Sequence, residues 1–176
     1  ISAIVEKNSK LIKSMTSRVA SKVAHEMDKG QMEGKRPEEL MHQVLARWPQ
    51  LTRAHALLIA RTESSKATTA LTRVRAESAG LSWYVWKTSK DARVRSSHSH
   101  MDDVICRWKD PPSPEKLLHQ KDYGHYAPGE IFNCRCYPAP LLDYNDVSWP
   151  HKVYMNGRIR MMTLAAFKKL NGGGSL

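Results

Sequence analysis

The chain has 176 residues, of which 41% are apolar, and its 28 Lys and Arg against 17 Asp and Glu give a formal net charge of +11. This length suits one ordinary domain, or a small domain with a helical arm. The longest apolar run, residues 54–60, is far shorter than the ~20 residues of a membrane helix, so we expect neither a membrane span nor a membrane partner.

The positive charge is spread along the chain instead of forming one basic run. A diffuse excess of this kind is typical of non-specific contact with a polyanion, most simply DNA. A solvated surface that keeps the protein in solution explains it equally well. The three cysteines follow no secretory segment, which favours free thiols or metal ligands in a reducing compartment over disulfides. Because the sequence starts at Ile1 and not at Met, we expect it to be a fragment of a longer protein.

Residues 1–80 are predicted to form a helical arm. Apolar residues recur every fourth position over 3–28, as in an amphipathic helix. A second helix is predicted within residues 36–49, where Pro37 suits the first turn. A third runs from about residue 52 to Gly80 without an internal Pro or Gly.

Residues 81–142 are predicted to form a compact α+β module, because the period of the sequence changes after Gly80. The aromatic run "LSWYVWKTS" predicts a first strand, and "VICRW" a second. The other expected elements are a short helix within 89–102, a short helix capped by Ser113, and an extended segment over 133–142.

Residues 143–176 are predicted to form a C-terminal tail. Asn156-Gly157 lies between alternating flanks, which is the sequence signal of a β-hairpin turn. A short helix over 164–171 and a linker over 172–176 follow. The fold class is therefore α+β, with a helical arm, a small module and a hairpin–helix tail.

A polar run, "WKTSKDARVRSSHSHMDD", offers groups that could bind a divalent metal or act as a base in phosphodiester hydrolysis. A nuclease site would draw on His98, His100, Asp102 and Asp103. On a helix, however, residues two apart point about 200° away from each other. At most one of the two histidines would then join a site, unless the backbone is extended.

Cys134 and Cys136 form the most informative pair. In an extended segment residues i and i+2 face the same way, so both sulfurs could reach one ion. A histidine of the polar run would add a third ligand, and Cys106, His100 or a water a fourth. Buried free thiols are the alternative explanation of the spacing.

Three motifs in order resemble the phage Mu F-like family of head-morphogenesis, or minor head, proteins, over roughly residues 55–142. They are "ARTESSKA", the polar run above and "PGEIFNCRCYP". The positions that match the family motifs are Arg61, Thr62, Glu63, Trp86, Thr88, Asp91, Arg93, Arg95, His98, Asn133, Cys134, Arg135 and Cys136.

The resemblance bears on the metal. Some relatives carry cysteine at the positions of Arg95 and His98, and a cysteine-for-histidine exchange is typical of ligands to a soft metal. Relatives often have a histidine where this chain has Ile131, so two potential ligands are missing here. The resemblance implies one structural zinc, with His98, Cys134 and Cys136 as its ligands.

The resemblance also implies a role. Family members are low-copy proteins inside the heads of tailed phages, and they associate with the portal and act in DNA packaging or delivery. For this chain we therefore expect a structural and non-enzymatic protein inside the virion head near the portal, assembled in the host cytoplasm. Its expected partners are the portal protein, other head proteins and double-stranded DNA bound without sequence preference. A metal-dependent nuclease and a stand-alone DNA-binding module are the competing hypotheses, although no helix-turn-helix or zinc-finger spacing supports the second.

Two finer expectations concern how the module is held. Arg61 and Glu63 are predicted to lie at the junction of arm and module. There a partly buried arginine–carboxylate pair would form where the helix face of Arg61 meets the polar run that contains Asp91. Three tryptophans, Trp83, Trp86 and Trp108, are predicted to form one cluster that staples the module, as an alternative or a supplement to zinc.

Overall fold

The computed structural model describes residue 29, residues 33–49 and residues 51–171. The amphipathic helix expected over 3–28 and the linker expected over 172–176 lie outside the described residues. The chain forms two compact units, residues 1–67 and 68–176. The division thus falls before residue 80, so the last turns of the long helix belong to the second unit. The predicted α+β class is confirmed.

The first unit contains helix α3 (Pro37–Arg47) and the beginning of helix α4 (Arg53–Ser78). Pro37 opens α3, where its missing N–H costs nothing, and the Glu39 carboxylate accepts a hydrogen bond from the Arg36 N–H at 3.4 Å. These features confirm the predicted start of the helix. The two helices bury one apolar cluster, made of Leu40, Met41, Val44, Ala56 and Ala60.

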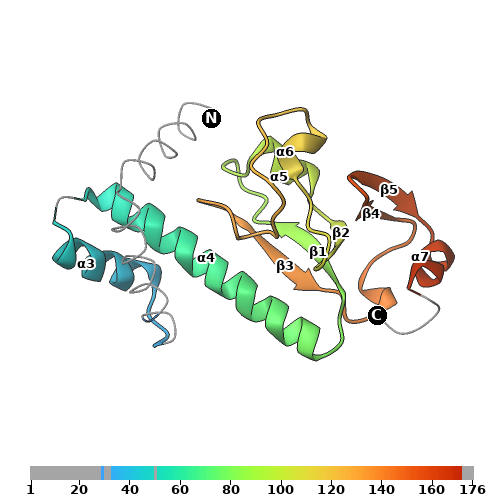
Figure 1. Cartoon of the computed structure of the whole chain (residues 1–176), viewed down its shortest axis with the longest axis horizontal. Helices are drawn as coiled ribbons and strands as arrows, with labels where there is room; N and C mark the ends of the chain where they lie inside the picture. The colour runs from blue at the N-terminus through green and yellow to red at the C-terminus, as the bar shows by residue number, and fades with distance from the viewer. Residues whose placement is uncertain (1–28, 30–32, 50, 172–176) are drawn as a thin grey trace. The chain divides into compact units, whose positions relative to one another are not determined.

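The second unit is built on a five-stranded sheet (Figure 1), in the order β3-β1-β2-β4-β5. Neighbouring strands are antiparallel except β2 and β4, which run parallel and pair through Ile105 and Val153. The strands are β1 (Trp83–Thr88), β2 (Val104–Arg107), β3 (Cys136–Pro140), β4 (His151–Met155) and β5 (Arg158–Met162).

The C-terminal hairpin extends this sheet and is not a separate tail. Asn156 and Gly157 have φ of +51° and +76°, the left-handed pair that a two-residue hairpin turn needs. The predicted turn is confirmed. Because β4 pairs with β2, residues 151–162 complete the sheet that β1 begins. We therefore treat the predicted module of 81–142 and the predicted tail as one folded unit.

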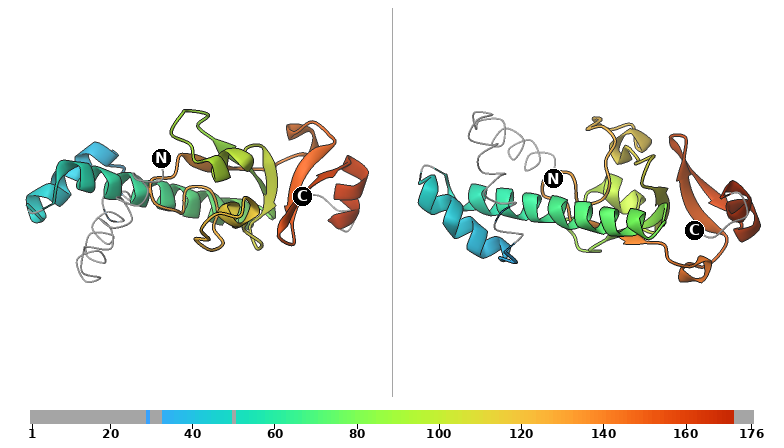
Figure 2. Two further views of the ribbon diagram at one scale, coloured as in Figure 1. Left: turned by 90° about the horizontal axis from the view of Figure 1, so that it is seen from above. Right: turned by 60° about the horizontal axis from the view of Figure 1, so that its bottom comes forward.

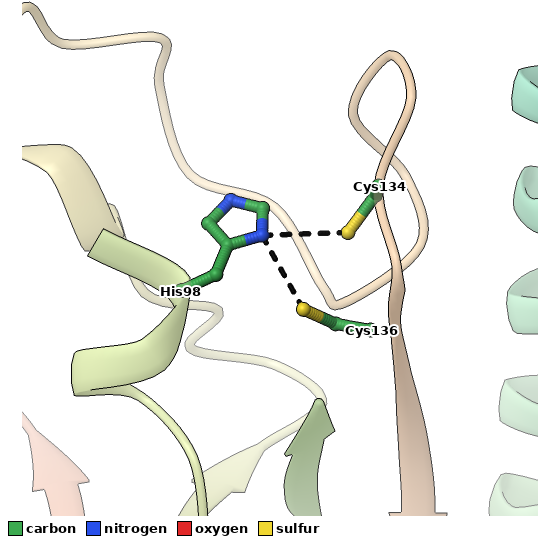
Figure 3. A group of neighbouring side chains, drawn as sticks. All are labelled: His98, Cys134 and Cys136. Atoms are coloured by element: carbon green, nitrogen blue, oxygen red, sulfur yellow. Dashed lines mark hydrogen bonds between the residues drawn. The ribbon is translucent and has the colours of Figure 1, made fainter. Parts of the chain in front are cut away.

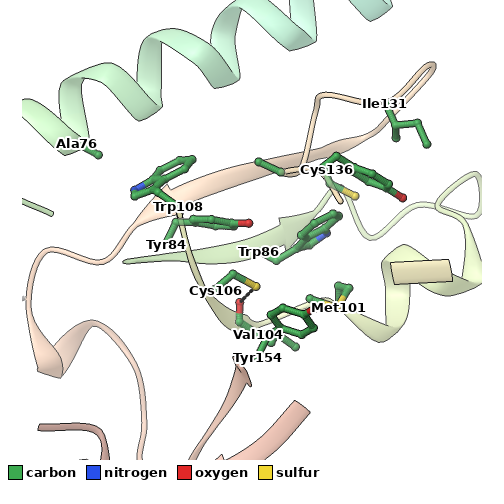
Figure 4. Packing of buried hydrophobic residues seen from close by; sticks show 12 residues of the cluster. Ala76, Tyr84, Trp86, Met101, Val104, Cys106, Trp108, Ile131, Cys136 and Tyr154 are labelled. Carbon is green, nitrogen blue, oxygen red and sulfur yellow. Dashed lines mark hydrogen bonds between the residues drawn. The ribbon is translucent and has the colours of Figure 1, made fainter. Parts of the chain in front are cut away.

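The sheet separates two apolar clusters, and strand β1 contributes alternate residues to each. Tyr84 and Trp86 face the first cluster, together with Trp108 (Figure 4). Trp83 faces the second, beside Phe167. The predicted single cluster of three tryptophans is therefore wrong, because the alternation of side chains along β1 places Trp83 on the opposite face from Trp86.

Short helices cover the two faces. Helix α5 (Ser96–His100) and helix α6 (Pro114–Leu117) lie where the sequence predicts them, and a 3-10 turn spans Tyr144–Asp146. Helix α7 (Leu164–Leu170) lies beside the β4–β5 hairpin (Figure 2). No helix in the described part of the chain is long and apolar enough to cross a bilayer.

The end of α4 belongs to the first cluster of the sheet. Ala76 is buried there, and the Thr69 hydroxyl donates a hydrogen bond of 2.7 Å to the carbonyl of Pro128. Gly80, with φ of +80°, lets the chain turn out of the helix while the Leu81 N–H bonds back to the Ala76 carbonyl. The loop that precedes the two cysteines is thereby tied to α4.

The β4–β5 hairpin and α7 are expected to unfold together with the rest of the sheet. Phe167 is fully buried and contacts Trp83 and Trp149 at ring-centroid distances of 4.9 and 5.0 Å. Phe167→Ala should therefore lower the free energy of unfolding by about 3–5 kcal/mol, measured by urea denaturation. Met161, 61% exposed, gives the control, and Met161→Ala should change it by less than ~0.5 kcal/mol. Equal stability of the two variants would show that the hairpin and helix are an independent tail.

Candidate metal centre

Three potential metal ligands converge on the first face of the sheet (Figure 3). His98 projects from α5, Cys136 is the first residue of β3, and Cys134 lies in the loop before it. The His98 Nδ1 atom is 3.5 Å from the Cys134 sulfur and 3.4 Å from the Cys136 sulfur. All three ligand atoms lie within 4.8 Å of one another. The structure thus brings together the three ligands predicted for the zinc.

The spacing fits a tetrahedral ion. A zinc bound to sulfur at about 2.3 Å and to nitrogen at about 2.0 Å, with tetrahedral angles, holds those two atoms roughly 3.5 Å apart. The two measured nitrogen–sulfur distances agree with this value. His98 and Cys136 are buried, and Cys134 is partly buried. The three side chains are therefore suitable ligands for one zinc ion.

Local backbone features place the two sulfurs. Cys136 is in register with Thr88 of β1, so the sheet fixes its position. Asn133 has φ of +50°, a left-handed conformation that asparagine tolerates better than most residues. The turn at Asn133 positions Cys134 next to His98. The Cys134 sulfur also accepts a hydrogen bond of 3.3 Å from the Gly129 N–H. A backbone N–H aimed at sulfur stabilises the thiolate form, which is the form that binds metal.

A second line of hydrogen bonds orients the histidine from its other side. The His98 Nε2 atom is 3.0 Å from the Tyr126 hydroxyl, which donates to Glu115 at 2.6 Å. Because the hydroxyl proton is committed to the carboxylate, its oxygen must accept the His98 Nε2–H. The Nδ1 atom that faces the sulfurs is then left as the ligand atom. Metal-binding histidines are commonly oriented in this way.

Glu115 keeps its charge although it is almost completely buried, at 3% exposure. Burial acts to raise the pKa of Glu115, but hydrogen bonds with His98 and Tyr126 outweigh it, so the pKa lies below its ordinary value. Ser97 adds a further donor at 3.0 Å. Burial and the neighbouring carboxylate raise the pKa of Tyr126, so the phenol stays protonated. Two hydroxyl donors, Tyr126 and Ser97, together with the His98 ring 3.6 Å away, therefore offset the cost of burying this carboxylate.

The pKa values of the two cysteine thiols are shifted in opposite directions. The hydrogen bond from Cys136 is the largest cause that lowers the pKa of Cys134, and His98 adds to it. The same hydrogen bond raises the pKa of Cys136. Burial acts to lower the pKa of His98, but hydrogen bonds with Cys134 and Glu115 raise it overall. A thiolate at Cys134 is the form of this side chain that binds a divalent metal.

No fourth protein ligand joins the group among the described residues. Cys106 is fully buried, and its sulfur contacts the Val104 carbonyl at 3.7 Å. His100 is exposed on the far side of α5 from His98, as the helical spacing predicts. Of the three fourth ligands considered from the sequence, only water is therefore compatible with this group.

The acidic residues of the polar run support the backbone and do not gather into a metal site. Asp102 accepts hydrogen bonds from the N–H and the hydroxyl of Thr88 at 2.8 and 2.9 Å. Asp103 pairs with Lys87 at 2.5 Å. Within the described part of the chain, the four residues of the nuclease hypothesis form no common ligand group.

Asp91, in the polar run that Arg61 is predicted to face, pairs with a different arginine. Asp91 accepts from Arg135 at 2.6 Å and from the Arg93 N–H at 2.9 Å. Glu63 pairs with Lys66 at 2.9 Å, one helical turn away, and Arg61 is exposed. The ion pair between Asp91 and Arg135 joins the polar run to the segment that carries the two cysteines.

Two further motif residues surround the metal centre. Trp86 is buried with its ring 5.4 Å from the His98 ring, edge to face. Arg95 donates to the Phe132 carbonyl at 2.7 Å and lies over the Phe132 ring at 4.6 Å. Where some relatives carry a cysteine, this arginine therefore braces the loop before Cys134.

Sequence reasoning missed Glu115 and Tyr126. Nothing in "PSPEKLL" or "YGHYAPG" distinguishes a buried acceptor or a hydroxyl relay from ordinary surface residues. Their role follows only from the packing of α6 and the loop after it against α5. A glutamate that follows two prolines and a cap residue is usually a helix-start residue.

This arrangement defines a small α+β module with a Cys₂His group. Comparison with known proteins shows which family has this module. The profile of the family described as "Phage Mu protein F like protein" matches residues 21–138. An uncharacterized protein of Haemophilus influenzae is 36% identical over 146 residues, covering 83% of this chain. The chain spans 30% of the length of that relative. No solved structure matches.

The chain belongs to the phage Mu F-like family, as its three motifs predict. The matched region contains all the ligands of the candidate metal centre and both members of the hydrogen-bond line behind it. Membership indicates a phage head-morphogenesis protein.

Loss of a cysteine ligand should cost both metal and stability. We expect Cys134→Ser and Cys136→Ser each to reduce bound zinc to well below one ion per chain and to lower the free energy of unfolding by several kcal/mol, because coordination energy is also folding energy. Cys106→Ala is the control and should keep its zinc. Zinc is counted by elemental analysis and stability by thermal melting. Wild-type zinc content and melting in Cys134→Ser would show that this sulfur binds no metal.

The hydrogen bonds that connect His98, Tyr126 and Glu115 should increase the affinity of the candidate site for zinc. Tyr126→Phe removes the acceptor of the His98 Nε2–H and should weaken zinc binding about 10–100-fold, measured by competition with a chromophoric chelator. The exposed Tyr137 provides a matched control, and Tyr137→Phe should bind zinc as the wild type does. Unchanged affinity in Tyr126→Phe would mean that the ring is oriented by packing alone.

Proposed function

We propose that this chain is part of a structural minor head protein of a tailed bacteriophage. It lies inside the head, associates with the portal and other head proteins, and assists head assembly and DNA packaging or delivery. Its affinity for double-stranded DNA is electrostatic and independent of sequence. Within it, one structural zinc bound by His98, Cys134 and Cys136 stabilises the module.

The observation that carries the proposal is the family match over residues 21–138, which includes the Cys₂His group. Within this region the polar groups of the three motifs are used to hold the fold. Asp91 and Asp102 brace backbone segments, and Glu115 orients a ligand. Side chains engaged in this way suit a rigid structural part better than a catalytic site, which needs groups available to substrate.

Zinc in this position would act on folding. His98, on α5, and the two cysteines, at the start of β3, are far apart in the sequence, so a shared ion closes a long loop. When bound, the ion supplies charge neutralisation for the thiolates and fixes the angle between α5 and β3. The residues of the chain supply the orientation, through Tyr126 and Glu115, and exclude bulk water from two of the three ligands.

The DNA affinity is argued from charge. The net charge of +11 is distributed over the chain, and neither the sequence nor the described fold contains an element that reads bases in a groove. Contact with phosphates of any sequence is the mode of binding that remains, and it weakens steeply with salt.

A nuclease is the second candidate, motivated by the open fourth position of a three-ligand site. Its proposed residues are dispersed, however, since His98 is buried, His100 is exposed and Asp102 is bonded to β1. Nicking of plasmid DNA by the purified chain with Mg²⁺, Mn²⁺ or Zn²⁺, lost in both His98→Ala and His100→Ala, would favour this candidate over the structural role.

The proposal predicts where the protein is found. In purified particles of the phage that carries it, the protein should be present at few copies per head and protected from added protease until the heads are opened. Crosslinking should join it to the portal protein. A head protein exposed on the outer surface, whose protease sensitivity is known, serves as the control. Absence from the heads, or cleavage while they are intact, would contradict the proposal.

A further inference from the structure

A cavity away from the metal centre gathers basic side chains from separate parts of the second unit. Its volume is about 310 Å³. Lys116 and His119 come from the end of α6 and the residues after it, His125 from the following loop, and Arg158 from the start of β5. Four potential cations on one concave surface are the pattern expected of an anion site.

The two permanent cations of this cavity form no close ion pair in the part of the chain that the structure describes. Among the described residues neither Lys116 nor Arg158 forms an ion pair within 4.0 Å. By contrast, Lys87 and Arg135, in the same unit, each pair with a carboxylate. The charge of the cavity is therefore available to a ligand.

The acidic groups nearby direct their hydrogen bonds elsewhere, although the charge of Asp122 still attracts Lys116 and His125. Hydrogen bonds from Ser113 and Gly124 are the largest causes that lower the pKa of the Asp122 carboxyl, and Lys116 and His125 lower it further. Asp122 accepts a hydrogen bond of 2.7 Å from Ser113, which lines the cavity, and one of 2.8 Å from the Gly124 N–H. Glu115, the neighbour of Lys116 on α6, is buried on the opposite side against His98 and Tyr126. Adjacent residues of one short helix thus serve two sites, the metal centre and the cavity.

The remaining lining provides a polar floor and a further donor. The side chain of Tyr154, on β4, lines the cavity but is only 2% exposed, so it forms the floor. His125 Nδ1 lies 2.8 Å from the Pro111 carbonyl, so that nitrogen carries a proton. Its Nε2 is left for a ligand and donates when the ring is protonated. Size, charge and donors match a phosphate group with part of a nucleotide attached.

We propose that this cavity binds a phosphate group, with Lys116 and Arg158 as the principal contacts. The site goes beyond the proposed function, and it rests on the proposed DNA affinity only for the source of the phosphate. That source is either the backbone of duplex DNA or a small phosphate compound, and the two are separated by experiment.

The test compares two double variants of the full chain. Lys116→Gln with Arg158→Gln removes both cavity cations. Lys109→Gln with Arg160→Gln removes the same charge from exposed residues that do not line the cavity, and so controls for net charge. Binding of a duplex of arbitrary sequence is measured by fluorescence anisotropy at several salt concentrations. Binding of inorganic phosphate is measured by amide chemical shifts at Gly157 and Arg158, or at the substituted residue.

For the cavity variant we expect duplex affinity to fall at least tenfold and the salt slope to decrease by about 2, one for each lost phosphate contact. The control variant should lose less than threefold. A specific loss of duplex binding identifies DNA as the source, whereas a loss confined to inorganic phosphate identifies a small compound. Cavity and control variants that match each other with both probes would overturn the site. A wild type that binds phosphate but no DNA would instead refute the proposed DNA affinity alone.

Discussion

The hydrogen bond between His98 and Tyr126 is the constraint on which the metal centre depends. It commits Nε2 to a proton, and so aims Nδ1 at the sulfurs of Cys134 and Cys136. The Tyr126 hydroxyl in turn donates a hydrogen bond of 2.6 Å to the buried carboxylate of Glu115, which fixes the position of the phenol. Three separate segments, α5, α6 and the loop after it, must pack together for this line to form. A change at any point of it should weaken the orientation of the ring toward the two cysteines.

Elements on both faces of the sheet support the hydrogen-bonded residues His98, Tyr126 and Glu115. The sheet fixes Cys136 through its register with Thr88, and Thr69 of α4 holds the loop that leads to Cys134. On the other face, α7 and the β4–β5 hairpin complete the core around Trp83. The module therefore combines an apolar core on each face of the sheet with one polar, charged group buried at its edge.

Much of this architecture could be predicted from local signals. Pro37, Gly80 and Asn156-Gly157 mark where elements start and turn, and the structure confirms them. The cluster of potential metal ligands was also predictable, because spacing and family resemblance both pointed to Cys134 and Cys136. Three features required the structure. The joining of β4 to β2 is a long-range pairing with no local signal, the alternation along β1 separated Trp83 from Trp86, and Asp91 pairs with Arg135 and not with Arg61. The hydrogen-bond partners of His98 could not be predicted, because in the sequence Glu115 looks like any glutamate at the start of a helix.

X-ray absorption at the zinc edge tests the central claim most directly. The purified chain, prepared under reducing conditions without added metal, is measured as isolated. The structure predicts one zinc per chain with two sulfur neighbours at about 2.3 Å, one imidazole nitrogen at about 2.0 Å and one lighter oxygen neighbour. A chain without zinc, or a zinc whose spectrum shows no sulfur or only one, would contradict the assignment of His98, Cys134 and Cys136 as its ligands.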